Sequence, residues 1–256
     1  MPSSEGRSAE ADPNSVLGRS VALLGAFRPG DDALGLAEIH RRTGMPKPTA
    51  HRLLGQLVAW GLLERADDGY RLGMRLYELG QLVPAQHGIE QQLTPVVHRL
   101  HATTGLTVHL AVLDRTEVVY LHKLDAGGAP PLASRVGGRL PAHATAVGKA
   151  VLAHAPARQT RTVLDHGLRR VSPRTVVAPS LFLGQLDAVR SRGYAREDEE
   201  SAVGVSCIAA PIFGADHHAV AALSVTARTH DVRTSAPVHA VRRAAAEASR
   251  LLRASA

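Results

Sequence analysis

The stretch Arg41–Leu63, RRTGMPKPTAHRLLGQLVAWGLL, predicts a helix whose start is firmly fixed. Pro48 suits the first turn of a helix, because the N–H group that proline lacks would have no intrahelical partner there. Gly44 and Gly61 are typical of the residues that end the preceding helix and this one. Every charged residue from Arg41 to Arg52 is basic, so a well-defined helix carries a positive surface.

Helical periodicity divides this helix, which we expect to end near Trp60, into two faces. The inner face is apolar and consists of Ala50, Leu53, Leu54 and Leu57. The opposite face has small residues among long polar ones: Pro48, Arg52, Gly55 and Ala59, flanked by His51 and Gln56. Small residues let a helix approach another surface closely. Arginine and glutamine can then reach base edges, and lysine or histidine can reach phosphates.

The neighbouring segments predict a winged helix-turn-helix. A helix capped by Asn14 or Ser15 should run to about Phe27, and a short helix should cover residues 36–43. LLERADDGYRL then indicates two strands around a tight turn at residues 67–69. Three helices closed by a hairpin favour DNA binding over the alternative, a small helical domain with a basic, solvated face. The first helix is expected to turn five apolar residues inward: Val16, Leu17, Val21, Leu24 and Phe27.

Composition is that of a globular protein of about two domains. Hydrophobic residues make up 45% of the 256 residues and charged residues 21%. A single cysteine, Cys207, excludes an intramolecular disulfide framework and fits a reducing, cytoplasmic setting. The polar N-terminus, residues 1–13, has no signal-peptide core and is expected to be a disordered tail. No apolar run approaches the ~20 residues of a membrane span, so no membrane is expected as a partner.

The net charge of +7 is not concentrated in the predicted DNA-binding region. Residues 1–80 carry ten Lys/Arg and ten Asp/Glu, whereas residues 81–256 carry twenty and thirteen. The excess over residues 81–256 is mostly scattered arginine, for which a solvated surface is the simplest explanation. The case for nucleic-acid binding therefore depends on local placement rather than on bulk basicity.

The rest of the chain predicts an α+β domain around a mostly antiparallel sheet. GMRLYELGQLV, residues 73–83, is an amphipathic linker helix ended by Pro84, and a helix with a possible kink at Thr94-Pro95 follows. Strands are expected at 106–113, 117–124, 132–141, 202–213 and 219–228. Helices are expected within 143–154, 157–165 and 180–192, and from about residue 236.

Several motifs are weaker than they look. Val147–Ala150, VGKA, lacks the other residues of a phosphate loop, so Lys149 is expected to be structural or on the surface. No G-x-S-x-G elbow is present, and no His or Cys spacing matches a metal site, so we expect no catalytic residues, no metal and no cofactor. The acidic run Glu197–Glu200 is expected to be a solvated turn, except for a member that points inward.

Strand alternation gives a more specific hypothesis. Cys207 should share a face with Val203, Val205 and Ala209, and Ser224 should share one with Thr226. Two hydroxyls at positions i and i+2 among small side chains suit the floor of a polar-lined cavity. The alternative is two ordinary strand hydroxyls bonded to backbone. For Cys207, which lies in an apolar strand, we expect an inert buried thiol.

The order of these elements resembles the IclR family of bacterial transcription regulators. PKPTAHRLLGQLVAWGLLER with GYRLG carries the resemblance in the first half, and RVGGRLPAHATAVGKAVLA with GYAREDEESAVGVSCIAAPIFGADHHAVAALSV carries it in the second. It covers roughly residues 15–250. It implies a winged helix-turn-helix at 14–73, a linker helix at 74–87 and a GAF-like effector-binding domain at 88–256. Lys47, Thr49, His51, Arg52 and Gln56 are the expected DNA contacts.

The resemblance also implies a small, usually acidic, effector. Its contacts fall at Leu140, Ala146, Val147, Glu197, Cys207, Ser224 and Thr226; several members carry Asp and Ser at the positions of Glu197 and Thr226. We expect the effector's carboxylate to meet the backbone N–H groups of Ala144, Thr145, Ala146 and Gly148. Ser224 and Thr226 would then donate to other oxygens of the effector.

Together these inferences predict a ligand-responsive transcription regulator, a repressor rather than an activator. Its expected partners are a double-stranded DNA operator, a small organic acid and further copies of the chain, as a dimer or tetramer that reads a near-palindrome. Two other classes stay open from the residues alone. One is a small-molecule enzyme with an accessory helical domain, and the other is an architectural DNA-binding protein with a collapsed, ligand-free pocket.

Overall fold

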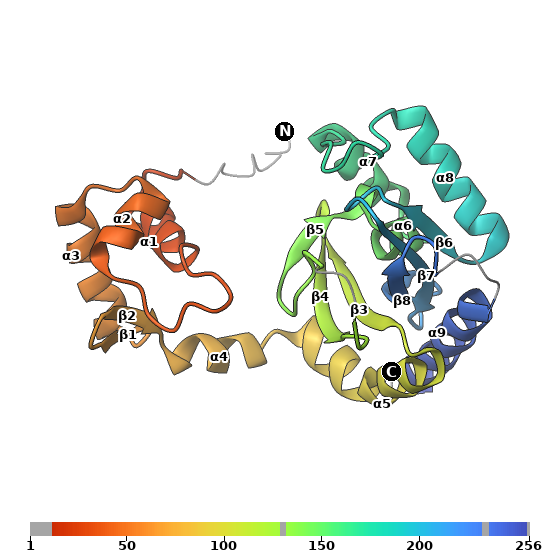
Figure 1. Ribbon diagram of the computed structural model, residues 1–256, viewed down its shortest axis with the longest axis horizontal. Coiled ribbons are helices and arrows are strands. Elements are labelled where there is room, and N and C mark those ends of the chain that lie inside the picture. Colours follow the sequence, from red (N-terminus) through yellow and green to blue (C-terminus); the bar gives the residue numbers. More distant parts are fainter. Residues whose placement is uncertain (1–11, 129–131, 232–235, 255–256) are drawn as a thin grey trace, which may run out of the picture. The chain divides into compact units, whose positions relative to one another are not determined.

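The chain forms two compact units, residues 1–84 and 85–256, in a computed structural model that describes residues 12–128, 132–231 and 236–254 (Figure 1). Most of the predicted N-terminal tail, residues 1–11, lies outside the described residues. None of the helices in the described ranges is both long and apolar enough to cross a membrane.

The first unit is a winged helix-turn-helix, as predicted. It contains α1 (Val16–Leu24), α2 (Leu36–Thr43), α3 (Lys47–Ala59), β1 (Leu63–Ala66) and β2 (Gly69–Leu72), followed by α4 (Met74–Gln81). Ser15 caps α1, and Gly44 ends α2 in the left-handed conformation. Its core is apolar and includes Leu23, Ile39, Ala50, Leu53, Leu54, Leu57 and Tyr70.

The wing is fastened to the helices by its own backbone. Leu34 and Tyr70 exchange backbone hydrogen bonds of 2.8 and 3.0 Å, which form an isolated antiparallel bridge. Gly69 lies so close to Leu34 that an added Cβ would stand 2.2 Å from its carbonyl oxygen. Only glycine fits this position, so the hairpin is held against the loop before α2.

The predicted inner face of α1 is wrong in part. Leu24 and Phe27 pack against the core, but Val16, Leu17 and Val21 are 60%, 74% and 59% exposed. The buried residue of α1 is Leu23, which the prediction omitted. Periodicity detected a second apolar stripe on this short helix that has no partner within the described unit.

The second unit is an α+β domain built on one antiparallel sheet, as predicted. Its strand order is β5-β4-β3-β8-β7-β6. The strands are β3 (Thr107–Asp114), β4 (Glu117–Leu124), β5 (Arg139–Pro141), β6 (Ala195–Asp198), β7 (Val205–Phe213) and β8 (Ala219–Arg228). The helices are α5 (Pro84–Thr104), α6 (Ala146–Leu152), α7 (Ala157–His166), α8 (Pro179–Arg192) and α9 (Ala236–Ala254), with a 3-10 turn at Ala142–Ala144.

Helices cover both faces of this sheet (Figure 1). α5 and α9 pack on one face over a Leu/Val/Ile core that includes Leu110, Ile208 and Leu223. α6 and α8 pack on the other face over a core of smaller side chains. Alternation along β7 and β8 sends Cys207, Ser224 and Thr226 to this second face, which is where the polar residues collect.

Three predicted elements differ in extent. Pro84 begins α5 instead of merely ending the linker helix, and α5 runs through Pro95 as one helix. Of the predicted strand 132–141, Arg139–Pro141 form β5, and Gly137 and Gly138 before it make backbone hydrogen bonds with Tyr120 of β4. β7 starts at Val205, so Val203 does not share the face of Cys207; it lies in a turn and is 67% exposed. This turn leads from the acidic run Glu197–Glu200 into β7.

Candidate functional site

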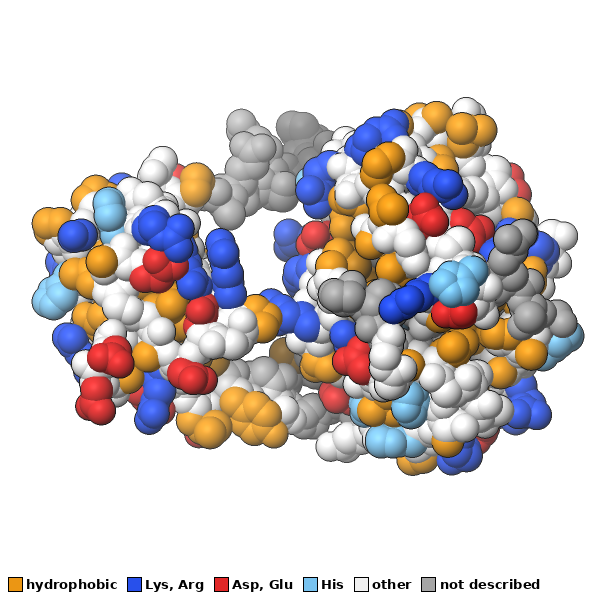
Figure 2. Space-filling view, viewed as in Figure 1, with side chains coloured by type: hydrophobic (Ala, Val, Ile, Leu, Met, Phe, Trp, Pro, Cys, Tyr) orange, Lys and Arg blue, Asp and Glu red, His pale blue; other side chains and the backbone are white. Residues whose placement is uncertain are grey.

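The outer face of α3 carries the predicted DNA contacts. Lys47, His51, Arg52 and Gln56 are exposed, whereas Thr49 is half-buried. A Cβ added at Gly55, on the same face, would have no atom within 4 Å, so another surface can approach the helix there. Figure 2 shows acidic side chains interspersed with basic ones over the first unit, in line with its balanced charge.

Two arginines of the basic stretch are not available to DNA as free charges. Arg42 donates to the carboxylates of Asp31 and Glu38 and to the carbonyl oxygen of Ala26, and Arg41 donates to Glu38. These arginines lower the pKa of Glu38 to about 2. Arg42 thus ties α2 to the loop before it through Asp31 and Ala26, whereas Arg41 pairs with Glu38 of the same helix on its surface.

The second unit encloses a cavity of about 40 Å³ between the second face of the sheet and α6. All seven residues predicted as effector contacts line it. Sixteen described residues form the wall: Leu140, Ala146, Val147, Glu197, Cys207, Ser224 and Thr226, together with His109, Tyr120, Leu132, Ala133, Ser134, Thr145, Ser201, Ala202 and Val205. The volume is enough for a few water molecules.

One side of the cavity is a chain of neutral polar groups on β3, β7 and β8. His109 lies opposite Ser224 in the strand register. Its Nε2 shares a hydrogen bond of 2.8 Å with Ser134 Oγ, and its Nδ1 lies 3.5 Å from the hydroxyls of both Ser224 and Thr226. Thr226 Oγ1 in turn lies 3.0 Å from Cys207 Sγ. Burial lowers the pKa of His109 to about 3, so its imidazole is neutral.

Glu197 forms the acidic side of the cavity from the end of β6. Its carboxylate is almost fully buried and accepts the backbone N–H groups of Glu200 and Ser201, the latter at 2.8 Å. Burial raises the pKa of Glu197 to about 7, although these N–H donors and Lys149 oppose the shift. Burial and the Glu197 charge also raise the pKa of Cys207 to about 12, which keeps the thiol protonated and inert, as predicted.

α6 closes the cavity, but not with the set of free N–H groups that was predicted. Gly148 N–H donates to Thr145 Oγ1 at 3.1 Å, and Thr145 N–H donates to Ala142 O at 3.4 Å. Gly148 lacks a side chain for a packing reason, because an added Cβ would stand 2.1 Å from Ala142 O. Gly148 therefore brings α6 against the 3-10 turn instead of offering its N–H to a ligand.

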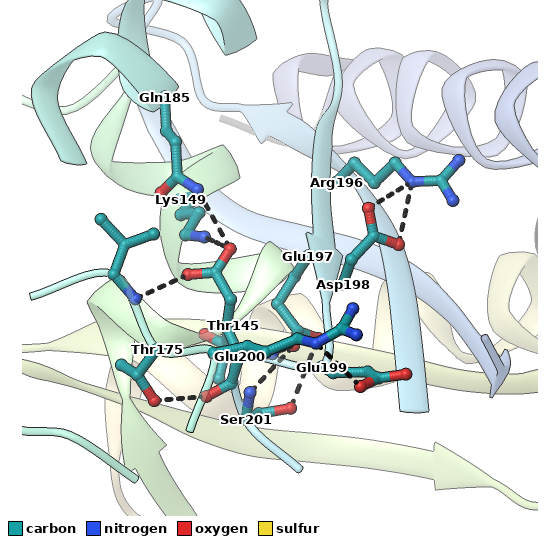
Figure 3. A network of polar contacts seen from close by, with 12 residues as sticks. Thr145, Lys149, Thr175, Gln185, Arg196, Glu197, Asp198, Glu199, Glu200 and Ser201 are labelled. Atoms are coloured by element: carbon teal, nitrogen blue, oxygen red, sulfur yellow. Dashed lines mark hydrogen bonds and ion pairs between the residues drawn. The ribbon is translucent and has the colours of Figure 1, made fainter. Parts of the chain in front are cut away.

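Lys149 is structural, and its partner is in the acidic run (Figure 3). Its Nζ forms a buried ion pair with Glu200 Oε1, where the two side chains are 1% and 7% exposed. Gln185 of α8 donates to the same oxygen at 3.0 Å, and Thr175 Oγ1 donates to the Glu200 carbonyl at 2.8 Å. Two members of the acidic run, Glu197 and Glu200, thus point inward, one to the cavity and one to α6.

Sequence reasoning missed four polar wall residues: His109, Tyr120, Ser134 and Ser201. Burial strongly raises the pKa of Tyr120, whose ring lies 5.0 Å from the ring of His109. The sequence does contain a clue to His109. It is a polar residue between Val108 and Leu110 in an apolar strand, so its side chain points to the opposite face of the sheet from theirs. Within the described ranges, no group of three or more His, Cys, Asp or Glu side chains is placed to hold a metal ion.

A winged helix-turn-helix joined in one chain to a second domain with a polar cavity defines the protein as a DNA-binding transcription regulator. The family follows from two matches: residues 16–67 match the IclR helix-turn-helix domain, and residues 81–250 match the C-terminal domain of the bacterial transcriptional regulator IclR. The chain belongs to the IclR family. The relatives that it matches are transcription regulators and not enzymes.

Individual relatives match over most of their length. The chain is 32% identical to the transcriptional regulator XynR of Escherichia coli over 84% of this chain and 86% of that protein, and 34% identical to BhcR of Paracoccus denitrificans over 84% and 80%. An IclR homolog from Microbacterium hydrocarbonoxydans, solved with 4-hydroxybenzoate, is 34% identical with a TM-score of 0.83, over 94% of this chain and all of that one. The Thermotoga maritima IclR structure gives 27% identity and a TM-score of 0.74, over 92% and 98%.

Proposed function

We propose that the protein is a repressor whose affinity for a DNA operator is controlled by a small organic acid in the cavity of the second unit. The observation that carries the proposal is that residues from five separate helices and strands meet at one cavity. The seven residues that the family resemblance implies as effector contacts come from β5, α6, β6, β7 and β8, and all of them line one cavity. A core with only a structural role has little reason to collect an imidazole, two hydroxyls and a carboxylate at one point.

The proposed operator contacts are Lys47, Thr49, His51, Arg52 and Gln56 on α3, with 14–73 as the DNA-binding domain. Their exposure beside the open surface at Gly55 supports the assignment. Residues 74–87 would act as the linker helix and 88–256 as the effector-binding domain.

The ligand class is supported by the relative solved with 4-hydroxybenzoate and by the chemistry of the wall. Ser224 and Thr226 can donate to ligand oxygens, and His109 can donate or accept according to its tautomer. A cavity of about 40 Å³ is smaller than such a ligand, so binding has to displace part of the wall. A ligand that binds one arrangement of the domain better than another shifts the equilibrium between them, which is the energy available to change DNA affinity.

A binding and gel-shift experiment tests this proposal. A panel of organic acids is titrated into wild type and Ser224→Ala/Thr226→Val by thermal shift and calorimetry, and each binder is added to a gel shift on the cognate operator. We expect the double variant to bind at least tenfold more weakly, because it loses two hydroxyl donors. Ser206→Ala is the control, since its hydroxyl bonds to Thr229 and does not line the cavity. Equal affinity of an identified effector for wild type and the double variant would place the site elsewhere.

We also propose that the first unit pairs with a second copy. Apolar residues stand exposed on α1 and α4, among them Leu17, Val21, Met74 and Tyr77. A stripe of this kind on two helices is typical of an interface, and two winged units are needed to read a near-palindrome. Light scattering at micromolar concentration should give a dimer or larger. A mass of only 27.1 kDa would refute pairing, and Leu17→Glu/Tyr77→Glu should yield that monomer.

A further inference from the structure

The cavity is built to receive a ligand, yet its wall offers no fixed positive charge. Among the described residues that line it there is no lysine and no arginine, and Glu197 is its carboxylate. His109 is neutral at physiological pH because it is buried. An organic acid that enters as its anion therefore adds a negative charge to a space in which ionised Glu197 already places one.

The cations on α6, β4 and β6 next to the cavity are already paired with carboxylates. Lys149 on α6 is paired with Glu200, deep in the domain. Lys123 on β4, which faces His109, lies 3.0 Å from Asp125. Asp198, next to Glu197 in β6, is paired with Arg196 at 2.9 Å. None of these pairs has charge to spare for a ligand, and breaking a buried pair to release one is costly.

Glu197 has an oxygen that can take a proton without loss of its backbone contacts. Oε1 accepts the N–H groups of Glu200 and Ser201. Oε2 is left with the Ser201 hydroxyl at 3.3 Å (Figure 3). A proton on Oε2 would neutralise the acidic side of the cavity and turn a group that can only accept into a donor.

We propose that this cavity binds a monocarboxylate together with one proton, which Glu197 takes up from solvent on Oε2. The inference rests on the proposed function and gives the chemistry of recognition: charge is conserved in the site, because one anion and one proton enter together. The protonated carboxyl then donates to an oxygen of the ligand, opposite the hydroxyls of Ser224 and Thr226. Since Glu197 titrates near neutral pH when the cavity is free, the added negative charge has only to complete its protonation.

The test is calorimetry with benzoate and 4-hydroxybenzoate as acids and benzamide as the neutral control, from pH 5.5 to pH 9. In buffers of different ionisation enthalpy, each acid should bind with uptake of about one proton at pH 8 and above. Linkage to a group with a pKa near 7 weakens acid binding roughly fifty-fold between pH 7 and pH 9. Benzamide affinity should not change with pH by this amount.

Glu197→Gln mimics the protonated side chain and should make acid binding independent of pH above 7, with no proton uptake. Glu199→Gln is the matched control, because Glu199 lies in the same turn but pairs outward with Arg174; it should keep the wild-type pH dependence. Uptake that persists in Glu197→Gln would show that the ligand itself carries the proton and would overturn the inference. So would acid binding without uptake in wild type, or no acid binding at any pH. Proton-linked binding that leaves operator affinity unchanged would instead refute the proposed function and leave this inference standing.

Discussion

The outer face of α3 and the buried side of α6 each carry a lysine, under opposite conditions. Lys47, the first residue of α3, is exposed to solvent, whereas Lys149 of α6 is fully buried. The exposed charge on α3 is solvated by water and needs no protein partner. The buried charge on α6 is stable only because a carboxylate is buried beside it. A substitution on the outer face of α3 should therefore affect one residue at a time, whereas a substitution at Lys149 also affects Glu200 and its other partners.

The largest expected effect comes from removing the buried ion pair between Lys149 and Glu200. Lys149→Met should destabilise the second unit by ~3–5 kcal/mol, because Glu200 would be left as an unpaired buried charge. Denaturant unfolding measures the loss. Lys47→Met is the matched control on the exposed helix and should change stability by less than ~0.5 kcal/mol. If Lys149→Met/Glu200→Leu is as unstable as the single variant, packing and not charge is what the pair provides.

The second prediction concerns the pH dependence of stability and compares Glu197 of the second unit with Glu38 of the first. The folded-state pKa of Glu197 is raised to about 7 from an ordinary 4.5, so its contribution to stability is complete below pH 4.5 and is lost as pH rises through 7. This shift corresponds to about 3 kcal/mol. Denaturant melts between pH 4.5 and pH 8 should show the decline, and Glu197→Gln should remove most of it. An unchanged profile in that variant would assign the titration to another group.

Glu38 has the opposite sign, since Arg41 and Arg42 hold its pKa down to about 2. Its stabilising contribution is present above pH 4.5 and is lost as pH falls toward 2. The two carboxylates therefore give the two units opposite responses to acid.

The smallest expected effect on folding separates two arginines ten residues apart. Arg52→Ala should leave stability unchanged and weaken specific operator binding by ~1–3 kcal/mol if it reads a base. Arg42→Ala should lower the thermal stability of the first unit, because Asp31, Glu38 and the Ala26 carbonyl lose their common donor. Gel shifts at several salt concentrations and thermal melts measure both variants. Unchanged affinity of Arg52→Ala at every salt concentration would remove Arg52 from the interface.

Sequence was most informative where structure is local. Pro48, Gly44 and the i, i+3, i+4 pattern of leucines are enough to place α3 and its inner face, since helix geometry relates neighbours directly. The same pattern failed on α1, where Val16 and Val21 are apolar but exposed. Periodicity reports that a face is apolar, not whether the same chain covers it.

The cavity could be predicted only in outline, because it depends on pairings far apart in sequence. Alternation placed Ser224 and Thr226 on one face, but only the register of β3 on β8 brings His109 against them. The partner of Lys149 is fifty-one residues away in the acidic run, and no local pattern identifies which of four acids it is. Val203 was misplaced because β7 begins only at Val205, and no local pattern marks where the turn after β6 ends.

The pairing of β3 with β8 also fixes when the cavity can form during synthesis of the chain. His109 and Ser224 are separated by 115 residues, and a ribosome adding about 5–20 residues per second takes roughly 6–23 s to cover that interval. The winged unit needs nothing beyond its own hairpin, so its fold can be complete long before the central strand pair of the sheet exists. A nascent chain therefore acquires its DNA-binding fold first and its cavity only after β8 has emerged.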